Sequence, residues 1–150
     1  MKPTIVAGAL TLALALPATA GAASYSTSSV ALIAGQPSPP SLSVSFTVKS
    51  VNGKPKSVKK FQANGIPFTC DNGSTGTTTE PARLGKKMRV NDKKKFHGGA
   101  KLGPTTMKVK GQLKGGGKRG KGTVRIIGPE ASDPTVTCDS GPVTWRVRRT

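Results

Sequence analysis

The sequence predicts an all-β domain, an antiparallel β-sandwich of seven to nine short strands, with an open β-barrel as the alternative fold. Apolar and polar residues alternate with a period of two in several segments, which is the pattern of half-buried strands. Glycine, asparagine and proline separate these segments, and no stretch after residue 23 keeps a helical periodicity. Two cysteines in similar contexts predict one covalent link between strands that are distant in sequence.

The clearest strand of the first half spans residues 42–49, where Leu42, Val44, Phe46 and Val48 share one face. Asn-Gly pairs after residues 51 and 63 are turn signals. Four further strands are expected at residues 57–61, 66–70, 83–90 and 93–97.

In the second half, residues 106–114 form the clearest strand, because Met107, Val109 and Leu113 alternate with polar residues. A glycine-rich hairpin tip follows this strand. The remaining strands are expected at residues 122–127, 135–138 and 143–149. The last of these contains the only tryptophan, Trp145, which we expect in the core.

The N-terminus has the features of a secretory signal peptide. Lys2 supplies a positive charge, residues 5–16 are almost entirely apolar, and Ala18-Thr19-Ala20 matches a signal-peptidase site. The apolar stretch is shorter than the roughly 20 residues that span a bilayer, so we expect no transmembrane segment. A buried N-terminal helix is the alternative interpretation.

These features predict three segments along the chain. Residues 1–20 are a cleaved signal peptide, residues 21–41 are a flexible leader rich in serine and proline, and residues 42–150 are a single β-domain. The expected localisation is secreted, extracellular or at the cell surface.

Both cysteines lie in a repeated Thr-Cys-Asp-(Asn/Ser)-Gly motif, which is typical of a strand that ends in a tight turn. Export places the thiols in an oxidising compartment, so we expect a disulfide between Cys70 and Cys138. Two free thiols are the alternative. A structural zinc site would need four ligands, and two cysteines with one histidine supply too few.

The chain carries 24 Lys and Arg residues against six Asp and Glu, a formal net charge of +18 at pH 7. Such a charge attracts polyanions, and many of the cations occupy outward-facing strand positions or hairpin tips. We therefore predict an anion-binding surface for a cell-wall polymer, an acidic polysaccharide or another anionic surface, with no specific nucleic acid and no cofactor. Its predicted residues are Lys87, Arg89, Lys108, Lys110, Lys114, Lys118, Arg119, Lys121, Arg125, Arg146 and Arg148.

Catalysis has few candidate residues. His97 is the only histidine, so every Ser-His or Cys-His arrangement depends on it. The sequence therefore predicts a non-catalytic protein, and a structural or adhesive protein-interaction module is the alternative to polymer binding. We also predict no metal site. Asp71 and Asp139, beside the cysteines, are more typical of turn formers than of calcium ligands.

From residue 42 to residue 149 the chain resembles small secreted proteins of unknown function that are frequent in soil actinobacteria. The residues that carry the resemblance are the two cysteine motifs, the hairpin of residues 111–127, and Trp145 with Arg146 after the second motif. The resemblance implies a one-disulfide β-domain behind a signal peptide, and it implies no activity.

Overall fold

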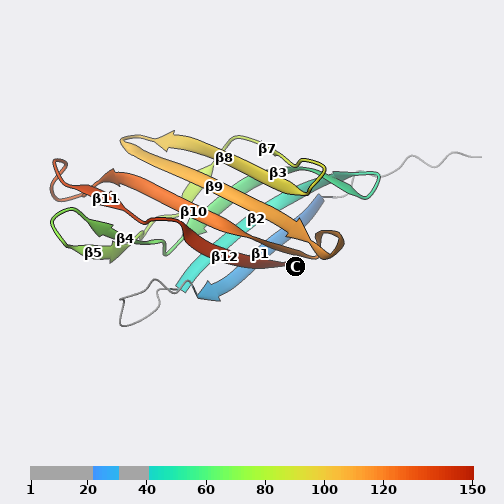
Figure 1. Cartoon of the computed structure of the whole chain (residues 1–150), viewed down its shortest axis with the longest axis horizontal. Coiled ribbons are helices and arrows are strands. Elements are labelled where there is room, and N and C mark those ends of the chain that lie inside the picture. Colours follow the sequence, from blue (N-terminus) through green and yellow to red (C-terminus); the bar gives the residue numbers. More distant parts are fainter. Residues whose placement is uncertain (1–21, 31–40) are drawn as a thin grey trace, which may run out of the picture.

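The computed structural model describes residues 22–30 and 41–150, and the predicted signal peptide lies outside them. Two antiparallel sheets, of four and seven strands, pack face to face and enclose one hydrophobic core. Figure 1 shows the two layers crossing at an angle, with β8, β9 and β10 in front of β2 and β3. The predicted all-β sandwich is confirmed.

The four-stranded layer is built around a long hairpin. Its strands are β2 (Ser41–Val51), β3 (Lys54–Asn64), β6 (Ala82–Leu84) and β7 (Met88–Arg89). Asn52 and Gly53 both have positive φ angles, as a two-residue hairpin turn requires. β3 pairs with β2 along one edge and with β6 and β7 along the other.

The seven-stranded layer is organised around β10, which pairs with β9 along one edge and with β12 and β11 along the other. β8 extends the layer beyond β9, and β4 and β5 extend it beyond β11. Its strands are β4 (Pro67–Cys70), β5 (Thr75–Thr77), β8 (Lys95–Leu102), β9 (Thr105–Lys114), β10 (Arg119–Pro129), β11 (Thr137–Asp139) and β12 (Val143–Arg149).

A further strand, β1 (Ala22–Val30), joins the two layers, because its main chain pairs with β2 on one side and with β12 on the other. Residues 22–30 are therefore a strand, and the prediction of a flexible leader was wrong for them. The segment lacks clear alternation, but the open edges of β2 and β12 offer its main chain hydrogen-bond partners on both sides. With β1 and several strands of two to four residues, the described part of the chain has twelve strands, more than the seven to nine predicted.

Four aromatic rings fill the centre of the core. Phe46 and Trp145 contact one another, and each contacts Phe61 and Phe96, with ring centroids 5.7 to 6.2 Å apart, and each of the four side chains is at most 2 % exposed. The predicted core position of Trp145 is confirmed. Gly122 lies over this cluster, and a Cβ there would stand 2.5 Å from Trp145 Cζ2. Only glycine lets the strand approach the indole so closely.

The predicted disulfide joins neighbouring strands at one end of the sandwich. Cys138 of β11 lies directly opposite Cys70 of β4, and the two residues are bonded. The turn glycines of both motifs, Gly73 and Gly141, have positive φ angles, which explains why glycine ends each motif.

Candidate anion-binding surface

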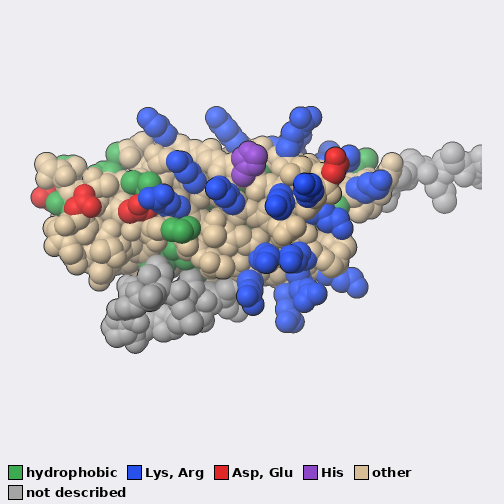
Figure 2. Space-filling view, in the orientation of Figure 1, with side chains coloured by type: hydrophobic (Ala, Val, Ile, Leu, Met, Phe, Trp, Pro, Cys, Tyr) green, Lys and Arg blue, Asp and Glu red, His purple; other side chains and the backbone are tan. Residues whose placement is uncertain are grey.

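The outer face of β8, β9, β10 and β12 is strongly basic. On each strand, one set of alternate residues enters the core and the other set, rich in Lys and Arg, points outward. Figure 2 shows these side chains spread over the surface, while several acidic side chains gather at one end of the molecule. We call this surface the basic face; its cations are Lys95, Lys101, Lys108, Lys110, Lys114, Arg119, Lys121, Arg125, Arg146 and Arg148.

The strand register places like charges directly opposite one another on the basic face. Arg119 of β10 lies between Lys114 of β9 and Arg148 of β12. In the next row, Lys121 lies opposite Arg146. Directly opposite like charges destabilise a sheet, so this arrangement works against folding. Because none of the four strands contains Asp or Glu, their own side chains supply no compensating acid.

A shallow hollow of about 370 Å³ lies in the middle of the basic face. Lys110, Lys121 and Arg146 stand on its rim, and Thr123 and Thr144 supply hydroxyl groups beside them. All three cations are exposed. The hollow therefore offers both charge and hydrogen-bond donors to an anion that lies across the strands.

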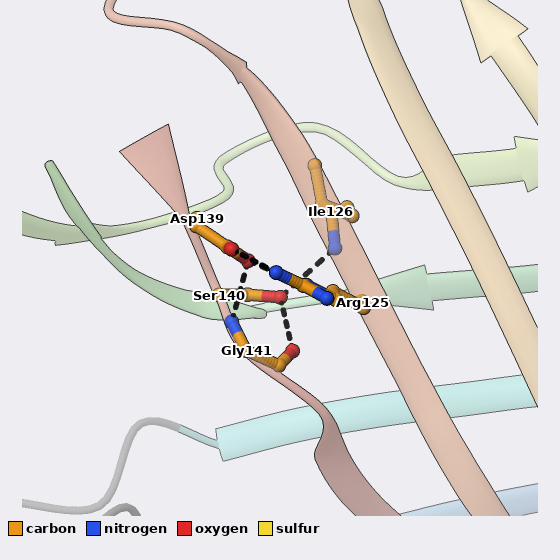
Figure 3. Close-up of polar contacts among 5 residues, drawn as sticks. All are labelled: Arg125, Ile126, Asp139, Ser140 and Gly141. Carbon is orange, nitrogen blue, oxygen red and sulfur yellow. Dashed lines mark hydrogen bonds and ion pairs between the residues drawn. The ribbon is translucent and has the colours of Figure 1, made fainter. Parts of the chain in front are cut away.

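Arg125, at the edge of the basic face, is engaged by an acid. Its Nε donates a hydrogen bond of 2.9 Å to Asp139 Oδ1, and its terminal nitrogen pairs with the other carboxylate oxygen (Figure 3). The bond from Arg125, helped by the Gly141 N–H, lowers the pKa of Asp139 against an opposing effect of partial burial. Arg125 is thus held in a bidentate ion pair with Asp139 at the edge of the basic face.

The remaining predicted residues fall in two places. Lys118 lies at the hairpin tip that follows Lys114, next to Arg119 and Arg148, so it extends one end of the basic face. Lys87 and Arg89 belong to the four-stranded layer, at β7, where this layer meets β8. The structure therefore separates these two residues from the face that holds the others.

A second, larger hollow, of about 550 Å³, lies at this junction of β7 with β8. We call it the seam cleft. No acidic side chain lines it. Its charged or titratable lining residues are Lys49, Lys56, Lys87, Arg89, Lys95 and His97.

Sequence reasoning missed several of these residues. Lys95 lines both hollows. Its side chain points outward because the next residue on β8, Phe96, is buried in the core. Ser57, which forms part of the seam cleft, is only 2 % exposed, and nothing in the sequence marks it, since its burial depends on strands that pair from elsewhere. His97 is exposed on β8 opposite Lys110.

Three further observations bear on other functions. The hydrogen bonds found in residues 22–30 and 41–150 do not join His97 to a serine or a carboxylate, as a nucleophile–base pair requires. Within the same residues, no three His, Cys, Asp or Glu side chains gather as a metal site needs. The part of the chain that the structure covers has no helix long and apolar enough to cross a membrane.

Comparison of the chain with protein-family models, with curated proteins and with solved structures finds no match. The resemblance to secreted actinobacterial proteins therefore stays a prediction.

Proposed function

We propose that this protein is an exported, non-catalytic β-domain that binds an anionic polymer across the basic face. The observation that carries the proposal is the register of Lys114, Arg119 and Arg148, and of Lys121 and Arg146, which places like charges opposite each other. This repulsion opposes folding, and an anionic ligand that lies over the face removes it.

The geometry of the sheet suits an extended ligand. Neighbouring strands lie about 4.8 Å apart, and residues two apart on one strand lie about 7 Å apart. The cations therefore form a two-dimensional array, and their regular spacing suits a polymer whose negative charges repeat along its chain. A cell-wall polymer, an acidic polysaccharide or another anionic surface has this chemistry. The disulfide between Cys70 and Cys138 supports an oxidising, extracytoplasmic location.

The test is retention of the secreted protein on purified cell wall and on immobilised polygalacturonate over a range of salt concentrations. We expect firm retention at low salt and a steep fall towards physiological salt, because the contacts are ionic. A triple variant of the basic face, Lys108→Gln, Lys110→Gln and Lys121→Gln, is expected to elute earlier.

A matched control removes three charges from the other layer, at Lys54, Lys59 and Lys86, which line neither hollow. This control is expected to elute close to the unmodified protein. Absence of retention at low salt, or equal loss in both variants, contradicts the proposal. Recovery of one specific protein partner at high salt would instead support a structural or adhesive module.

A further inference from the structure

We propose that the seam cleft is a discrete binding site for a short oligophosphate, separate from polymer binding on the basic face. Of the residues that line the two hollows, Lys95 alone is common to both. The cleft volume of about 550 Å³ lies within the range of small-ligand pockets, which is about 300–1,000 Å³.

Ser57 is the first reason to expect a ligand. It lies on β3 between Lys49 of β2 and Arg89 of β7, with only 2 % of its surface exposed. The hydrogen bonds of the described ranges include none to its hydroxyl. Ser57 lines the cleft, so its hydroxyl can donate a hydrogen bond to an anionic oxygen bound there.

The charge of the cleft is the second reason. Five Lys and Arg side chains line it without a carboxylate. Each carboxylate of a ligand brings one negative charge, whereas a terminal phosphate group carries about −1.5 to −2 near pH 7 with three acceptor oxygens. A short chain of phosphates therefore places the most negative charge, and the most acceptors for lysine ammonium groups, in this limited volume.

The main chain holds the two walls of the cleft together. Val90 N donates to Lys56 O at 3.0 Å, which ties β7 to β3. Asn91 N donates to Lys95 O at 2.9 Å, and the Asn91 side chain accepts a 2.8 Å bond from Lys95 N. These bonds fix the turn between β7 and β8, so the cations of both layers meet across a preformed cleft.

Calorimetric titration of the secreted protein with tripolyphosphate tests this site. We expect one tripolyphosphate per chain, and binding that persists at physiological salt. Ser57→Ala should weaken it about tenfold, the equivalent of a hydrogen bond to a charged group. Lys56→Gln with Lys87→Gln should weaken it at least as much. The matched control, Lys108→Gln with Lys121→Gln, removes the same charge from the basic face and should stay within about twofold, since exposed charges at a distance are screened.

Equal weakening by the cleft and face variants would mean general attraction of charge and would overturn the proposal, as would unchanged affinity of Ser57→Ala. Thermal melting establishes that each variant is folded. Amide chemical shifts of the unmodified protein give a measurement that needs no variant: tripolyphosphate must shift Ser57 and Lys56 before residues of the basic face. If the protein binds tripolyphosphate in the cleft but retains no polymer, the proposed function is refuted while the proposed oligophosphate site is supported.

Discussion

Replacing Arg119 by glutamate should stabilise the fold while it weakens polymer binding. Arg119 lies directly opposite Lys114 on one side and Arg148 on the other. The substitution turns two like-charged pairs into two oppositely charged pairs. Cross-strand charge pairs contribute roughly 0.2–1 kcal/mol each, so the free energy of unfolding should rise by about 1–2 kcal/mol at low salt. This corresponds to a melting temperature higher by roughly 3–8 °C.

Thermal and urea denaturation at low and high salt measure this effect. The gain should shrink at about 1 M salt, where the screening length is about 3 Å. Lys101→Glu is the matched control, because it changes the net charge equally while its cross-strand partner is Thr106. The control should gain clearly less stability. A lower melting temperature for Arg119→Glu at low salt, or a gain that salt does not reduce, would refute the reasoning that these charges oppose folding.

Replacing Cys70 and Cys138 by serine should lower the free energy of unfolding by about 4 kcal/mol, because the disulfide closes a loop with a sequence separation of 68. Urea denaturation measures this loss, and reductant should have no further effect on the double variant. Gly122→Ala should cost at least about 2 kcal/mol, because the new Cβ would lie 2.0 Å from the Lys110 carbonyl oxygen. Gly85→Ala, with open space around it, is the control and should melt close to the unmodified protein. The lowered pKa of Asp139 predicts stability that is present above about pH 4 and lost as the pH falls through the folded-state pKa. Asp139→Asn should remove this part of the acid dependence of urea denaturation, and identical pH profiles would contradict it.

The sequence predicted those strands in which buried apolar residues alternate with exposed polar residues. Strand β12 is the clearest case, because Val143, Trp145 and Val147 enter the core while Arg146 and Arg148 do not. The disulfide was also predictable, since the two cysteine motifs match and the N-terminus indicates export.

Other features depend on partners that are distant in the chain. β1 carries no strong alternation, and its place follows from the edges of β2 and β12. The seam cleft forms where β7 meets β8. Lys87 and Arg89 were predicted as anion-binding residues, but the sequence did not show that they lie beside residues of β8. Ser57 gave no signal because a serine on a polar strand face is usually exposed, and here neighbouring strands bury it.

The pairing of β1 with β12 also constrains how the chain is made. These two strands are the first and the last that the structure describes, so their pairing can form only after the strands between them have been made. During synthesis or export from the N-terminus, β1 emerges long before its partner, and such distant contacts slow folding. Strand β1 can join the two layers only after β12 has emerged. A truncation that removes β12 should therefore leave a chain with two open sheet edges, which favours aggregation over a smaller folded domain.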